Sequence, residues 1–295
     1  MGTWRRWLQA PQTLWWRRAL FQLHLWMGIG LGLYILMISV SGSAIVLRPQ
    51  ISRWLIPSQV PSTAGIELTG DALTARVAEV YAADYEIVNV VPSTREGRAT
   101  YVALLNDDGK EVTRFFDQYS GYDLGSTYPW PVATVEWLTR VHDELLLGRQ
   151  GRKLNGVGGI LFLLMTLSGV ILWWQGSKRW REGLMLRRGG TRSFNWQLHS
   201  FVGFWSLLLM FVWGLTSVYF AWPGPFDAVI DWMDSDLDDF ERPDGWLLTL
   251  IDFHFGRFRG LLWANILWIF LGLLPAVMFI TGFILWYRRV VKNWL

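Results

Sequence analysis

The sequence predicts a mainly α-helical integral membrane protein: a four-helix transmembrane bundle with one small α+β domain inserted between its first two helices. Hydrophobic residues make up 52% of the 295 positions. A helix needs about 20 predominantly apolar residues to cross a bilayer. Segment 48–135 is different, because short strand-like runs alternate there with turn residues. Four stretches are long and apolar enough to be spans: Leu20–Leu47, Leu154–Trp174, Trp196–Trp222 and Leu261–Tyr287.

Basic residues flank the predicted spans on one side only. They cluster before the first span, in the connection 176–195 and after the fourth span, whereas segment 223–260 is acidic. Because Lys and Arg are enriched in cytoplasmic flanks, we expect both termini to be cytoplasmic. The net charge of +3 restates this bias and does not indicate nucleic-acid binding. The first span is too long for a cleavable signal peptide, and no A-x-A site follows it.

The four spans look like a duplicated helical pair, an architecture that recurs in membrane proteins. The first and third spans share the phrase Gln-Leu-His, which ends at His24 and His199. The second and fourth share an exit pattern, in which Ser168-Gly169 and Thr281-Gly282 precede aliphatic residues and an aromatic pair. The predicted parts are the N-terminus with the first span (1–47), the inserted domain (48–135), an outer amphipathic segment with the second span (136–175), a basic loop (176–195), the third span (196–222), an acidic outer segment (223–260), and the fourth span with the C-terminus (261–295).

The inserted domain has the periodicities of one helix and a small sheet. Residues 68–81 repeat apolar positions at helical spacing, and 86–91, 100–105 and 110–117 are rich in strand-forming residues. Asn106-Asp107-Asp108-Gly109 is typical of a hairpin turn. We therefore expect a helix packed on a three-stranded antiparallel sheet.

The chain has four histidines, and two of them begin apolar spans. Residues four apart share a helix face, so Gly28 and Gly203 leave bare backbone beside His24 and His199. This pattern suits a flat haem that is ligated on both sides. Because the chain has no cysteine, such a haem would be bound non-covalently, as b-type haem is. The alternative is that these histidines make hydrogen bonds within the bundle and that the glycines allow close helix packing.

The other two histidines, His142 and His254, precede the second and fourth spans and suggest a second bis-histidine haem site on the outer side. We expect each on a short amphipathic element. Four arginines follow them and suit haem propionates or, alternatively, lipid headgroups: Arg149, Arg152, Arg257 and Arg259. The acidic segment favours a solvated loop over a hard-cation site, since EF-hand spacing is missing; its carboxylates are Asp227, Asp231, Asp234, Asp236, Asp238, Asp239, Glu241 and Asp244.

The end of the inserted domain carries a resemblance. Asp117-Gln118-Tyr119-Ser120-Gly121 resembles the closing turn of PepSY domains, where an aspartate, an aromatic residue and Ser/Thr-Gly precede a final strand. With the four spans and the Gln-Leu-His phrase, nearly the whole chain resembles the PepSY-associated transmembrane family. The resemblance implies a bacterial inner-membrane protein that holds two b haems. It also implies that the protein reduces a ferric siderophore or other ferric chelate on the outer side.

Electrons for such a reaction would have to come from outside the chain. The connection 176–195 is too short for a flavin or nicotinamide domain, so we expect a cytoplasmic reductase or a membrane quinol as donor. The glycine runs in the spans are not nucleotide-binding motifs, because no strand precedes them. Two other readings stay open: a membrane-anchored PepSY binding module without haem, and a cytochrome b-like subunit that relays electrons within a larger complex.

Overall fold

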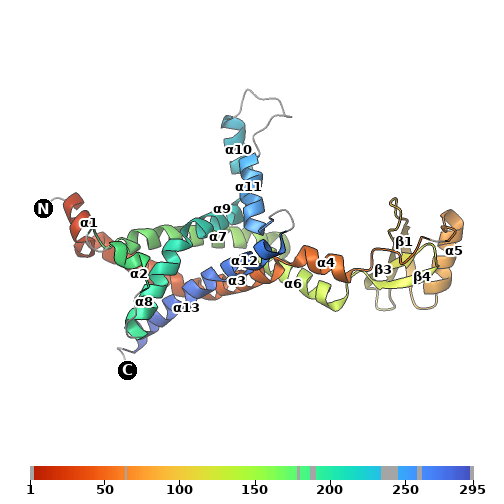
Figure 1. The fold of residues 1–295 in the computed structure, drawn as a ribbon, viewed down its shortest axis with the longest axis horizontal. Coiled ribbons are helices and arrows are strands. Elements are labelled where there is room, and N and C mark those ends of the chain that lie inside the picture. The colour runs from red at the N-terminus through yellow and green to blue at the C-terminus, as the bar shows by residue number, and fades with distance from the viewer. Residues whose placement is uncertain are drawn as a thin grey trace. The chain divides into compact units, whose positions relative to one another are not determined.

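The computed structural model describes residues 3–63, 65–177, 180–186, 191–233, 245–257 and 261–292, without the side chains of 191–193 and 245–246. The chain forms two compact units, a helical unit of Met1–Val46 with Leu138–Leu295 and an α+β unit of Leu47–Trp137. The predicted fold class is confirmed, except that the sheet has one strand more than expected. The helical unit is drawn in Figure 1.

Within the described residues of the helical unit, two helices are long and apolar enough to cross a membrane, and the number of candidate spans rises to four if each of two bent pairs counts as one span. The continuous ones are α7 (Gly148–Trp173) and the helix Leu262–Val291, which comprises α12 (Leu262–Gly272), α13 (Leu274–Trp286) and η3 (Tyr287–Val291). The bent pairs are α2 (Trp15–Gly30) with α3 (Gly32–Ile45), at 57°, and α8 (Thr191–Trp205) with α9 (Leu207–Ala221), at 62°.

The two bends occupy equivalent places in the sequence repeat. The first falls at Leu31, between two glycines, which are poor helix formers. The second falls at Ser206, whose hydroxyl donates to the carbonyl of Val202 at 2.6 Å, a bond that bends helices. Leu31 follows His24 by seven residues, and Ser206 follows His199 by seven residues. The matching bends support the predicted duplication.

Small residues allow the helices of this unit to pack closely. α7 lies along α9, and α3 lies along α12 and α13 (Figure 1). A Cβ atom at Gly158 would come 2.3 Å from the hydroxyl of Tyr34, and one at Gly159 would come 2.9 Å from that of Ser217. These glycines of α7 are therefore packing positions, as expected of small residues in membrane bundles.

Two short helices carry the outer histidines, as predicted, although the second is mostly apolar rather than amphipathic. His142 lies in the last turn of α6 (Trp130–Glu144), and His254 lies in the last turn of α11 (Gly245–Phe255). After α6 the chain turns through left-handed residues, with φ of 50° at Leu145 and 61° at Leu146. Gly256, with φ of 65°, ends α11 in the way that glycine commonly ends helices.

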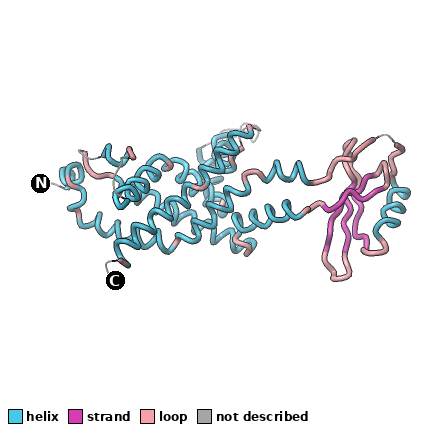
Figure 2. Tube along the Cα trace, turned by 60° about the horizontal axis from the view of Figure 1, so that its bottom comes forward, coloured by secondary structure: helices cyan, strands magenta, loops and turns pink. Residues whose placement is uncertain are grey.

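The α+β unit contains α5 (Gly70–Tyr81) and a four-stranded antiparallel sheet in the order β1-β2-β3-β4 (Figure 2). The strands are β1 (Glu86–Val91), β2 (Thr100–Leu105), β3 (Glu111–Asp117) and β4 (Tyr122–Ser126). The prediction of three strands was wrong, because β4 is short and contains Gly125 at φ 109°, which hides the strand pattern. The remaining described elements are α1 (Thr3–Gln9), η1 (Pro11–Thr13), α4 (Arg48–Leu55), η2 (Trp180–Leu184) and α10 (Gly224–Met233).

One face of α5 forms the core of this unit. Leu73, Val77 and Tyr81 recur every four residues and pack on strand side chains that include Val102 and Phe116. These side chains are almost completely buried, which accounts for the position of the helix on the sheet.

The Asp117 motif forms the turn into β4. The carboxylate of Asp117 is buried and accepts hydrogen bonds from the backbone N–H of Tyr119 at 2.8 Å and from the hydroxyl of Ser120 at 2.6 Å. Gly121, at φ 72°, completes the turn in a conformation that glycine adopts at little cost. The motif thus has a structural role in positioning the last strand.

Candidate functional site

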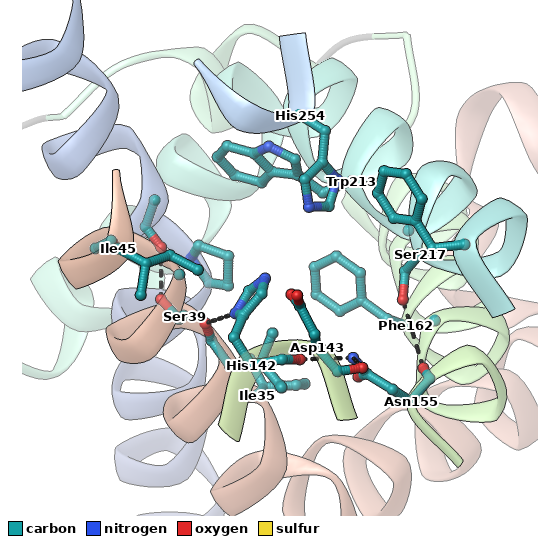
Figure 3. A pocket seen from close by; sticks show the side chains of 18 of the residues that line it. Ile35, Ser39, Ile45, His142, Asp143, Asn155, Phe162, Trp213, Ser217 and His254 are labelled. Atoms are coloured by element: carbon teal, nitrogen blue, oxygen red, sulfur yellow. Dashed lines mark hydrogen bonds between the residues drawn. The ribbon is translucent and has the colours of Figure 1, made fainter. Parts of the chain in front are cut away.

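His142 and His254 face each other across a cavity in the helical unit (Figure 3). Their ring centroids are 6.3 Å apart, and their planes make an angle of 64°. α6 contributes one ring and α11 the other, so the two rings come from different repeats of the sequence. This is one of the two histidine pairs that the sequence predicts as haem ligands.

The cavity between them has a volume of about 400 Å³, within the usual range for small-molecule sites. Its walls come from α3, α6, α7, α9, α11, α12 and the start of α13, and they are mostly apolar. Figure 3 shows Phe162 and Trp213 beside the space between the rings. The polar side chains with titratable or amide groups that line it, besides the two histidines, are Tyr34, Asp143, Arg152 and Asn155.

The orientation of the His142 ring follows from its contact with α3. Its Nδ1 lies 3.0 Å from the carbonyl oxygen of Ile38 and 3.4 Å from the hydroxyl of Ser41. A carbonyl only accepts, so Nδ1 of His142 carries the hydrogen and donates it. In a neutral imidazole the other nitrogen, Nε2, then has a free lone pair. Gly42 makes room for the ring, since a Cβ there would come 2.7 Å from its Cε1 atom.

The side-chain amide of Asn155 is hydrogen-bonded to the C-terminal end of α6. Its Nδ2 donates to the carbonyl of His142 at 2.7 Å, while its Oδ1 accepts from the hydroxyl of Tyr34 at 2.5 Å. Asn155 of α7 therefore joins α3 and α6 by hydrogen bonds next to His142.

The His254 ring is held in an equivalent way by α9. Its Nδ1 lies 2.5 Å from the hydroxyl of Thr216. That hydroxyl donates its single hydrogen to the carbonyl of Val212 at 2.7 Å, so toward the ring it can only accept. Nδ1 of His254 therefore carries the hydrogen, and Nε2 has the lone pair.

The inner histidines repeat this arrangement. Nδ1 of His24 lies 2.8 Å from the hydroxyl of Ser168, and Nδ1 of His199 lies 2.9 Å from that of Thr281. α2 packs on α7 and α13, and α8 packs on α13, so the two rings lie in one part of the bundle.

Sequence reasoning missed these hydroxyls, although a signal existed. Ser41 follows His24 by 17 residues, and Thr216 follows His199 by the same 17 residues. Ser168 and Thr281 had been noted only as part of the shared exit pattern. The hydroxyls of all four residues lie next to a histidine ring, so the repeat places a hydroxyl beside each ligand candidate.

The predicted glycines do not border the described cavity. A Cβ at Gly28 would come 3.9 Å from Sδ of Met165, and one at Gly203 would come 2.9 Å from Cε of Met278. Each glycine thus faces a flexible methionine of the next span, and its role beside a haem stays a prediction. Two other glycines border the inner rings, because a Cβ at Gly169 or Gly282 would come 3.4 Å or 3.3 Å from Cε1 of His24 or His199, respectively.

Of the predicted arginines, Arg152 lines the cavity, 3.9 Å from the carboxylate of Glu144. Arg149 is exposed and does not belong to the described lining. Arg257 lies over the ring of Phe255 at 4.4 Å and 3.9 Å from the carboxylate of Asp252. Arg259 lies outside the described residues.

The acidic segment is described only in part. Asp227 and Asp231 lie on α10, and the other predicted carboxylates lie outside the described residues: Asp234, Asp236, Asp238, Asp239, Glu241 and Asp244. Within the described part of the chain, no group of three or more histidine or acidic side chains is arranged to hold a metal ion.

The family model for the PepSY-associated TM region matches residues 21–243 and 234–289. The chain belongs to that family. The match covers both units, and it agrees with the sequence resemblance and with a membrane protein of several candidate spans. No curated protein matches the sequence significantly.

Proposed function

We propose that this PepSY-associated protein is a transmembrane electron carrier with two b-type haems. His142 and His254 would ligate one, and His24 and His199 the other. The observation that carries the proposal is the 6.3 Å separation of the outer rings across an apolar cavity. Metal–imidazole nitrogen bonds are about 2 Å long, so two rings at this separation would leave room for one metal ion that both could bind.

The protein groups around this pair fit the same purpose. Nδ1 of each ring donates a hydrogen bond, which leaves both Nε2 atoms available as ligands. Phe162, Trp213 and other apolar side chains line the space between the rings and would help to keep water away from a bound haem. Arg152 offers a guanidinium for a carboxylate such as a propionate. A haem held by two histidines would supply one-electron transfer through its iron and would disfavour oxygen binding.

We place the inner pair toward the cytoplasm and the outer pair toward the periplasm of a bacterial inner membrane, following the basic flanks. Residues of α2 and α8 would then receive electrons from a cytoplasmic reductase or a quinol. The acceptor on the outer side would be a ferric siderophore or other ferric chelate, as the family resemblance suggests. The protein would be an oxidoreductase in iron uptake.

A reduced-minus-oxidised absorbance spectrum of the purified protein, with a pyridine haemochrome titration, tests the proposal. We expect sharp α and Soret bands and two haems b per chain, followed by reoxidation when a ferric chelate is added. A red protein that ferric chelates do not reoxidise would instead be a relay subunit of a larger complex. A colourless protein, expressed with ample haem, would reject the proposal and leave a membrane-anchored binding module.

A further inference from the structure

We infer that Thr216, Ser168 and Thr281 are positioning residues that hold the hydrogen of a histidine ring on Nδ1 and so keep Nε2 bare for iron. The inference rests on the proposed function, and it names residues that do not touch a haem. Ser41 is the repeat counterpart of Thr216 but has no such role. The carbonyl of Ile38 already accepts the hydrogen bond from Nδ1 of His142.

The assignment follows from counting hydroxyl hydrogens. Ser168 donates to the carbonyl of Met165 at 2.8 Å, Thr281 to that of Val277 at 2.8 Å, and Thr216 to that of Val212 at 2.7 Å. A hydroxyl has one hydrogen, so each of these oxygens meets its histidine ring as an acceptor. Each ring must therefore donate from Nδ1 in its neutral form.

Burial makes these acceptors hard to replace. Ser168, Thr216 and Thr281 are 6%, 1% and 4% exposed, respectively. A ring N–H left without an acceptor in such surroundings costs free energy, whereas moving the hydrogen to Nε2 relieves that cost. The moved hydrogen would then occupy the nitrogen that has to bind iron. Loss of the hydroxyl thus acts on ligand strength through the tautomer.

Ser41 and Thr216 provide an internal comparison at the same repeat position. The Ser41 hydroxyl donates to the carbonyl of Met37 at 2.7 Å and lies 3.4 Å from Nδ1 of His142. The carbonyl of Ile38 lies closer, at 3.0 Å, and no side-chain substitution removes it. His142 therefore keeps its acceptor when Ser41 is changed, and His254 loses its described side-chain acceptor when Thr216 is changed.

The experiment compares Thr216→Val, Thr216→Ser and Ser41→Ala in the full-length protein. Thr216→Val removes the hydroxyl at nearly constant volume, and we expect haem affinity at the outer site to fall about 10- to 100-fold, as for other residues that orient metal ligands. The haem that remains bound should have a higher midpoint potential, because its histidine is a weaker base. Thr216→Ser and Ser41→Ala should both behave as wild type. Wild-type affinity and potential in Thr216→Val would overturn the inference.

A second readout does not need haem. With four histidines in the chain, ¹⁵N labelling of histidine in the haem-free protein gives signals from four rings, each with two nitrogens. We expect the hydrogen on Nδ1 in each wild-type ring and a switch of one ring to Nε2 in Thr216→Val. Hydrogen on Nε2 in the wild-type His254 ring would contradict the assignment. Failure of wild type to bind haem would reject the proposed function separately, while these spectra still decide how the rings are held.

Discussion

The imidazoles of His142 and His254 approach each other to 6.3 Å, and each is held in place by the bent span of its own repeat. α3 holds the first ring and α9 the second. The bends at Leu31 and Ser206 give each of these spans two differently directed halves, one carrying an inner histidine and the other the partner of an outer one. The outer site is thus built from two equivalent halves that meet at the cavity.

Substitution of the outer histidines tests whether they serve one site. We expect His142→Ala and His254→Ala each to reduce the haem content from two per chain to one. The double variant should also retain one haem, since residues that act as a unit are not additive. A pyridine haemochrome assay on protein of known concentration measures this. Loss of both haems in the double variant would contradict a separate inner site on His24 and His199.

A methyl group at Gly42 should disturb the outer site through steric contact alone. The Cβ of Gly42→Ala would lie 2.7 Å from Cε1 of His142, so the ring has to move away from its position facing His254. We expect weakened binding of one haem, seen as a broadened, shifted Soret band in a haem titration. Gly30→Ala is the matched control on the same span, because nothing lies within 4 Å of a Cβ there. Equal effects of the two substitutions would count against the described ring position.

Two neighbouring arginines should differ in their effect on haem binding. Both side chains are exposed, but Arg152 lines the cavity and Arg149, one turn earlier on α7, does not belong to its described lining. We expect Arg152→Ala to weaken the outer haem about tenfold, which corresponds to roughly 1.4 kcal/mol, a size reasonable for one charged hydrogen bond. Arg149→Ala should have no effect. Haem titration of both variants compares them, and a larger loss in Arg149→Ala would reject the assignment of Arg152.

The sheet of the α+β unit should depend on pH through Asp123. Burial by itself raises the pKa of this carboxyl, but hydrogen bonds from Arg114, the N–H of Gly125 and Tyr81 outweigh it and leave the pKa below its ordinary value of 3.8. A lowered folded-state pKa stabilises the fold above the unfolded value, and this stability is lost as the pH falls through the folded value. The pair is partly exposed, so the contribution is about 1 kcal/mol at most.

Asp123→Asn should therefore weaken protection of β3 and β4 at pH 7 and have little effect below the folded-state pKa. Hydrogen exchange of the two proteins, compared at each pH, removes the intrinsic pH dependence of exchange. Asp107→Asn, in the hairpin turn, provides a control carboxyl. An unchanged difference between wild type and Asp123→Asn down to pH 2 would show that the charge of Asp123 does not contribute.

Much of the fold could be predicted because apolar stretches and repeats are local signals. The spans, the short helices before the second and fourth spans, and α5 on its sheet all follow from periodicity. The bends at Leu31 and Ser206 were not predicted, since hydropathy does not distinguish a straight span from a bent one. β4 was missed because it is short and contains Gly125, and because the ion pair of its Asp123 with Arg114 joins two strands and is not visible in a single segment.

The candidate site was predicted in part for a related reason. Histidines are rare in spans, so composition alone singled out His24 and His199. Serine and threonine are common there and usually donate to their own helix, so Ser168 and Thr216 attracted no notice. Only the three-dimensional contact between one span and the next gives these hydroxyls a second role. The same holds for Gly42, whose importance depends on a ring from α6.

The described hydrogen bonds that orient the four rings all remain within one repeat. His24 and His142 take theirs from residues before position 173, and His199 and His254 take theirs from residues after position 207. Each half of the chain therefore orients two of the four histidine rings by itself, whereas the inner and the outer site each need one ring from both halves. A metal group that binds between the halves would stabilise their association. At a free concentration 100 times its dissociation constant, it would raise the free energy of unfolding by about 2.7 kcal/mol.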